Sequence, residues 1–127
     1  MGSWASGISA ITLFTDDLTA TKRFYEEVFG LAVQFEDDAS AVFTFGNTLV
    51  NLLSTDAADE LITPAVVAPP AAGARAQLTI TVGDVDATCA ALARRGVDLL
   101  NGPIDRPWGV RTASFRDPGG HIWEIAT

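Results

Sequence analysis

The chain contains two similar stretches, and this internal repeat limits its possible folds more than any other feature. Residues 11–31 and 78–97 align with a shift of 67 positions, the difference between Thr12 and Thr79, and the same shift places Asp17 on Asp84. Each stretch reads as a strand, an aspartate, a helix and a glycine. Repeats of this kind are supersecondary units that cover their apolar faces by packing together. We therefore expect two copies of one unit, with a functional site where the copies meet.

Hydrophobic periodicity predicts a βαβββ unit in each half of the chain. The first unit is expected to have strands at residues 8–15, 32–36, 41–45 and 48–54 and a helix at 18–29. The second is expected to have strands at 77–82, 98–100, 110–116 and 120–126, a helix at 85–95, a turn at 101–103 and a loop at 105–109. Asp17 and Asp84 are suited to cap the two helices, and Gly30 and Gly96 are suited to end them.

The proline- and alanine-rich segment 56–76 predicts a connector between the units, in which one short helical turn can form. It separates a first module at about 8–55 from a second at about 77–127, and a length of 127 residues suits one domain, residues 1–127. The fold class expected from this arrangement is α+β. Two βαβββ modules in a pseudo-two-fold arrangement would form curved mixed sheets with the helices outside.

Composition limits the partners of the chain. A net charge of −8 repels phosphate backbones and attracts cations, so nucleic acid is not expected as a partner. The same charge is also explained by solubility alone. No apolar run approaches the roughly 20 residues of a membrane span, and Cys89, the only cysteine, allows no intrachain disulfide. These features predict a cytoplasmic protein without a membrane partner.

Two segments carry a resemblance to a known family. The stretch DDLTATKRFYEEVFGL and the C-terminal stretch WGVRTASFRDPGGHIWEI, together with the two βαβββ units, resemble the vicinal oxygen chelate superfamily. That group includes glyoxalase I, extradiol dioxygenases, fosfomycin-resistance enzymes and bleomycin-resistance proteins. The resemblance covers residues 8–126 and is closest to the bleomycin-resistance type. It implies the fold but not one activity, because such superfamilies contain both metal enzymes and binding proteins.

The resemblance implies four metal-ligand positions, two on the opening strands and two on the closing strands of the units. They correspond here to Ala10, Gln77, Asn51 and Glu124. Only Glu124 is a strong ligand for a transition metal, and a catalytic site normally has three. The single histidine, His121, is three residues from Glu124 and is expected to face the other side of the strand. We therefore expect no metal and no cofactor.

The residues that replace the metal ligands are candidates for ligand binding. Asn51, Gln77 and Glu124 can form hydrogen bonds to a polar or cationic molecule, and Phe14 and Trp108 can contact its rings. Alternatively, the polar groups bond only to one another or to water, and Trp108 covers a cavity edge or contacts a second subunit. Glu124 is also a weak candidate for a general base, if burial raises its pKa.

These residues favour a metal-free protein that binds a small organic molecule, a drug or a metabolite. A planar cationic compound is the expected ligand, and antibiotic sequestration is one such role. One alternative is a diverged glyoxalase- or dioxygenase-like metalloenzyme, acting as a lyase or isomerase. Another is a structural or regulatory domain without a ligand. Because single-domain relatives pair, we also expect a homodimer with an isologous interface.

Overall fold

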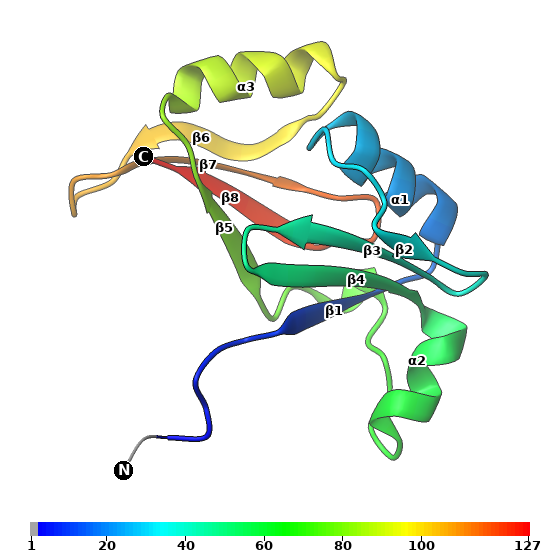
Figure 1. Cartoon of the computed structure of the whole chain (residues 1–127). Coiled ribbons are helices and arrows are strands. Elements are labelled where there is room, and N and C mark those ends of the chain that lie inside the picture. Colours follow the sequence, from blue (N-terminus) through cyan, green and yellow to red (C-terminus); the bar gives the residue numbers. More distant parts are fainter. Residues whose placement is uncertain (1–2) are drawn as a thin grey trace. The chain divides into compact units, whose positions relative to one another are not determined.

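The computed structural model describes residues 3–127 and contains two compact units, one ending at Val67 and the other beginning at Ala68. Each unit holds one four-stranded mixed sheet (Figure 1). The first unit consists of β1 (Ala10–Thr15), α1 (Leu18–Glu27), β2 (Phe35–Glu36), β3 (Ser40–Phe45), β4 (Thr48–Ser54) and α2 (Thr55–Ile62). Its strand order is β1-β4-β3-β2, with β1 parallel to β4 and the other pairs antiparallel.

The second unit repeats this topology, which confirms the prediction of two βαβββ units. It consists of a 3-10 turn (Pro70–Ala72), β5 (Gln77–Thr81), α3 (Val85–Arg94), β6 (Leu99–Asp105), β7 (Arg111–Arg116) and β8 (Ile122–Ala126). Its strand order is β5-β8-β7-β6, and β5 and β8 form the parallel pair. Among the residues described, no helix is long and apolar enough to span a membrane.

Three segments differ from the sequence-based expectation. The strand expected at 32–36 is only the two-residue β2, Phe35–Glu36. The connector contains the eight-residue helix α2, since the helix formers of residues 55–62 precede the first proline, Pro64. Residues 101–103 do not form a turn, because β6 runs through them as far as Asp105. The register of β6 against β7 shifts between Leu99 and Asn101 and again between Asn101 and Ile104, so the strand absorbs the irregular residues as bulges.

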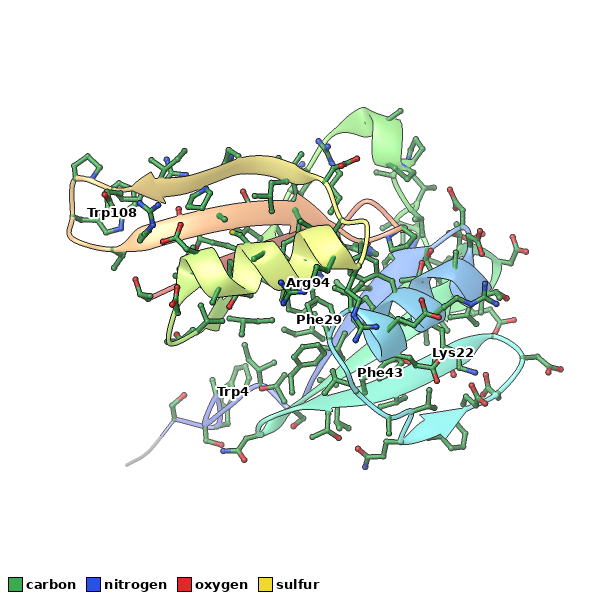
Figure 2. The ribbon with its side chains drawn as sticks, turned by 90° about the horizontal axis from the view of Figure 1, so that it is seen from above. Trp4, Lys22, Phe29, Phe43, Arg94 and Trp108 are labelled. Carbon is green, nitrogen blue, oxygen red and sulfur yellow. The ribbon has the colours of Figure 1, made fainter. Side chains whose placement is uncertain are left out.

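The core of each unit lies between its sheet and its long helix. In the first unit Tyr25 of α1 is fully buried, and its ring contacts Phe43 and Phe45 of β3 at centroid distances of 5.4 and 6.2 Å (Figure 2 labels Phe43). In the second, Val85, Cys89 and Leu92 of α3 are buried. Burial raises the pKa of the Cys89 thiol, which is a packing residue.

Both helices begin as the sequence predicts. Asp17 Oδ1 accepts a hydrogen bond of 3.0 Å from the Ala20 backbone N–H, and Asp84 Oδ1 accepts one of 3.0 Å from Ala87. In the first unit the cap is reinforced by Thr15 at the end of β1 and Thr21 in α1. Their hydroxyls are 2.9 Å apart, Thr15 accepts from the Asp17 N–H, and Thr21 donates to the Asp17 carbonyl. The turn from β1 into α1 is thereby fixed by side-chain hydrogen bonds.

Candidate functional site

The face of the second sheet away from α3 carries polar side chains on every strand, and four of them are in register. Thr79 pairs with Glu124, Glu124 with Ser114, and Ser114 with Asn101, so these four residues form a continuous row across the sheet. We call them the polar row. Thr79 Oγ1 donates to Glu124 Oε1 at 3.0 Å, and Ser114 Oγ donates to Asn101 Oδ1 at 3.1 Å. Glu124 is half-buried, and the hydrogen bond from Thr79 occupies one of its two carboxylate oxygens.

The opposite face of this sheet packs on α3 and is apolar. Trp123 and Ile125, the neighbours of Glu124 on β8, are each 2% exposed and pair with Phe115 and Ala113 of β7. Trp123 and Glu124 therefore face opposite sides of the sheet. Period-2 alternation places the Glu124 side chain on the face away from the helix.

Arg106 adjoins the end of the polar row. It follows β6, and its backbone N–H donates to the Val110 carbonyl at 2.7 Å in the β6–β7 hairpin. Its Nε donates to Thr112 Oγ1 at 2.8 Å, and its Nη2 donates to Asn101 Oδ1 at 3.3 Å. The guanidinium is thus held by neutral oxygens on the same face of the sheet as Glu124.

In the first unit Asn51 occupies the position on β4 that Glu124 occupies on β8. Asn51 pairs with Thr12 of β1, as Glu124 pairs with Thr79 of β5, and all lie on faces away from the long helices. The side-chain oxygen Oδ1 of Asn51 is buried and has no hydrogen-bond partner among the residues described. A buried amide oxygen without a partner is costly, so this position is suited to accept a hydrogen bond from a ligand.

The remaining predicted site residues lie on these faces or beyond them. Ala10 and Gln77 are the first residues of β1 and β5 and are exposed, and strand alternation places them on the same faces as Asn51 and Glu124, respectively. Phe14 pairs with Leu53 on the face of Asn51. Within each unit the structure therefore brings Phe14 and Ala10 to the side of Asn51, and Gln77 to the side of Glu124.

Trp108 lies outside the sheet, at the tip of the β6–β7 hairpin (Figure 2). Trp108 is 73% exposed. Trp108 is distant from Glu124 along the sheet. Glu124 pairs with Ser114, and Ser114 is three residues, or about 10 Å, from Arg111 at the start of β7. Trp108 lies beyond Arg111, in the loop. The role of Trp108 in ligand binding therefore remains a prediction.

The four positions implied for a metal do not fit a transition-metal ion. Ala10 has no donor atom, Asn51 and Gln77 offer only neutral amides, and Glu124 alone offers a carboxylate. No group of three or more histidine, cysteine, aspartate or glutamate residues within 3–127 is arranged to hold a metal. His121 precedes β8, and its Nδ1 lies 2.9 Å from both carboxylate oxygens of Asp117 in the adjoining turn.

Of the two arginines on β7, Arg111 is already engaged. It lies on the α3 side of the sheet, where its guanidinium contacts Asp86 and Asp105 at 3.0 Å each. Its hydrogen bond is the main reason that the pKa of Asp86 lies below its ordinary value. Arg116 is exposed at the other end of β7.

Sequence reasoning missed Thr79, Asn101, Ser114 and Arg106. The period-2 pattern of Gln77 and Thr79, and of Thr112 and Ser114, marks polar faces on two strands and was an available signal. The register that aligns these residues with Glu124 is a tertiary property. Asn101 and Arg106 were assigned to a turn and a loop, so their side chains had no predicted face.

Comparison with known proteins places the chain within one family. A sequence model described as the Glyoxalase/Bleomycin resistance protein/Dioxygenase superfamily matches residues 7–125. The uncharacterized protein YraH of Bacillus subtilis is 32% identical over 119 residues, which cover 91% of this chain and 93% of that protein.

Solved structures show the same fold. A glyoxalase-related enzyme from Fulvimarina pelagi is 29% identical, with a TM-score of 0.83 and coverage of 95% of this chain and 87% of that one. A glyoxalase/bleomycin resistance protein/dioxygenase from Nocardioides is 25% identical, with a TM-score of 0.83 and coverage of 94% and 82%. The similarity therefore extends over both βαβββ units.

Proposed function

The chain belongs to the glyoxalase/bleomycin resistance protein/dioxygenase superfamily, and from this premise we propose that it binds a small polar organic molecule without a metal ion. The observation that carries the proposal is the chemistry of the four positions where the metal-dependent relatives hold their ligands. Here they supply one carboxylate, two amides and one methyl group, in Glu124, Asn51, Gln77 and Ala10. Such a set suits hydrogen bonding to an organic ligand better than coordination of a cation.

The surroundings of these residues support a ligand with a cationic or hydrogen-donating group. Glu124 keeps acceptor capacity beyond its bond from Thr79, and Asn51 Oδ1 is a buried acceptor without a partner among the described residues. The net charge of −8 favours the approach of a cation. Phe14 and the exposed Trp108 offer aromatic surface, so we propose a planar ring system as part of the ligand. Sequestration of an aromatic antibiotic is one role of this kind.

The metal-free part of the proposal is tested by elemental analysis of protein purified without chelators. We expect no stoichiometric nickel, zinc, iron or manganese, because Glu124 alone does not form a transition-metal site. About one metal ion per chain, lost in Glu124→Ala, would contradict it. Turnover of a hemithioacetal or a catechol by the metal-loaded protein would support a diverged enzyme instead.

The binding part is tested by calorimetric titration with bleomycin-like and other cationic aromatic compounds. Glu124→Gln should weaken binding and remove much of its salt dependence, because it deletes the charge that attracts the ligand. Trp108→Ala should cost about 1 kcal/mol if the ring stacks on the ligand. Trp4→Ala, at another exposed tryptophan, is the matched control. If no compound binds below millimolar concentration, or if all variants bind equally, the proposal is wrong.

A further inference from the structure

We infer that Arg106 forms an anion-binding subsite at the end of the polar row, so that the ligand carries an acidic group as well as the group that Glu124 binds. The inference rests on the proposed function, and it specifies the ligand as a dipolar molecule. The acidic group is a carboxylate or another anion of similar size. This differs from a purely cationic ligand, which net charge alone would favour.

The first observation is the geometry of the guanidinium. Arginine has five N–H donors, and the side chain of Arg106 uses one at Thr112 Oγ1 and one at Asn101 Oδ1. Its other donors have no partner among the residues described. Asn101 Oδ1 also accepts from Ser114, so the acceptor that orients Arg106 is itself held in place. The guanidinium is fixed in direction with donors available, which is the arrangement that binds a planar anion.

The second observation is the charge of Arg106. It is half-buried and forms no ion pair with any residue described. The other half-buried cations in residues 3–127 are Lys22, paired with Glu36, and Arg111, paired with Asp86 and Asp105. A cation that has lost part of its hydration and bonds only to neutral oxygens still lacks an opposite charge, which a ligand anion would supply.

The spacing of the sheet sets the size of the ligand. Glu124, Ser114 and Asn101 lie on successive strands, and Arg106 Nη2 is 3.3 Å from Asn101 Oδ1. Neighbouring strands are about 4.8 Å apart, so the backbones of Glu124 and Asn101, two strands apart, are separated by roughly 10 Å. A simple amino acid is too short to reach from Glu124 to Arg106. The ligand class is therefore an elongated small molecule with a basic group and an acidic group at opposite ends.

The test uses ω-amino acids as rulers of increasing length. Wild-type protein is titrated at low ionic strength with ω-aminobutanoate, ω-aminohexanoate and ω-aminooctanoate, and with octanoate and octylamine as probes with one charge each. Binding is followed by NMR at the backbone amides of Asn101, Thr112 and Glu124. We expect ω-aminooctanoate to bind more tightly than the shorter amino acids and than either singly charged probe, because its two charged ends are about as far apart as the backbones of Glu124 and Asn101.

Variants then assign each end of the probe. Arg106→Gln should weaken ω-aminooctanoate about tenfold, the scale of one charge-assisted hydrogen bond, and leave octylamine unchanged. Glu124→Gln should weaken octylamine and leave octanoate unchanged. Arg94→Gln is the matched control, since it removes the same charge from an exposed arginine on α3, which covers the opposite face of the sheet. If Arg106→Gln does not fold, Arg106→Lys is the second variant. It keeps the charge but lacks the planar set of N–H donors, so it should bind ω-aminooctanoate more weakly than wild type.

The inference is overturned if Arg106→Gln binds ω-aminooctanoate like Arg94→Gln, or if octylamine binds wild type as tightly as ω-aminooctanoate. Absence of any shift at Asn101 and Thr112 with carboxylate probes overturns it as well. Cationic aromatic compounds that depend on Glu124 but not on Arg106 would leave the proposed function standing and remove only this inference. Conversely, octanoate binding that requires Arg106 would support the subsite even if no aromatic compound binds.

Discussion

Gly102 is the residue that allows β6 to pass close to β7. A Cβ atom at this position would lie 2.5 Å from the Thr112 carbonyl oxygen and 2.7 Å from Ala113 Cα. Its φ of +89° is in the region that side chains disfavour. Both neighbours are backbone atoms, so no side-chain rotation relieves the contact.

Gly102→Ala is therefore expected to be strongly destabilising, and Gly109→Ala separates its two causes. Gly109 has a φ of +94° but open space around its Cβ position. We expect Gly109→Ala to cost about 1–2 kcal/mol from backbone strain alone. Gly102→Ala should cost a further 1–3 kcal/mol, roughly, for the displacement of β6. Urea unfolding measures both, and equal losses in the two variants would show that β6 moves without cost.

Some residues of the candidate site can be predicted from the sequence, and others cannot. Glu124 and Asn51 were assigned by resemblance, and strand alternation then gave their faces, because the side-chain period of a strand is independent of what it pairs with. Arg106 was not predicted. Its role depends on Thr112 and Asn101, which meet it only after β6 and β7 have paired with their two register shifts. Local sequence does not encode that register.

At the scale of elements, the helices were predicted well and the irregular segments poorly. Aspartate caps and terminal glycines are local signals, and they placed α1 and α3 to within one or two residues of the structure. The helix α2 was not predicted, because its eight residues adjoin a proline-rich segment and the whole stretch was assigned to one connector by composition. Asn101 and Gly102 resemble a turn in sequence, yet both lie within β6, where Asn101 pairs with Ser114 and Gly102 falls in the irregularity before Ile104.

The contact of α3 with its sheet includes an ion cluster whose strength depends on pH. Arg111 on β7 bonds to Asp86 on α3 and to Asp105 on β6. Because the folded-state pKa of Asp86 is lowered, its contribution is present above the ordinary carboxyl value of 3.8 and is lost as pH falls through the folded pKa. Both aspartates are largely exposed, so the effect is modest.

Asp86→Asn should therefore lower stability near neutral pH and flatten the loss of stability in acid. The measurement is urea unfolding near neutral pH and again below the ordinary carboxyl pKa of 3.8. Asp98→Asn, at an exposed aspartate with no side-chain partner in the described structure, is the control. An acid profile of Asp86→Asn that superimposes on the wild type would show that the ion cluster contributes nothing to folding.

At the scale of the whole molecule, the assembly state is still a prediction. Several large apolar residues are exposed, among them Trp4 at 95%, Val66 at 83% and Trp108 at 73%. We expect a homodimer, and light scattering should give twice the 13.4 kDa chain mass at micromolar concentration. Trp4→Ser and Trp108→Ser, measured separately, would show which residue contributes to the interface. A monomer across this concentration range would contradict the expectation.

The strand pairings also bear on how the chain folds. The parallel pairs Ala10–Leu49 and Gln77–Ile122 join residues 39 and 45 positions apart, from 49 − 10 and 122 − 77. Among residues 3–127 no ladder joins a strand before Val67 to one after Ala68. Forming each sheet therefore costs loop-closure entropy only within its own half of the chain. Folding can begin in either half. The chain at residues 67–68 therefore acts as a tether. It keeps the two halves at a high effective concentration relative to each other, but neither sheet depends on it for a strand pairing.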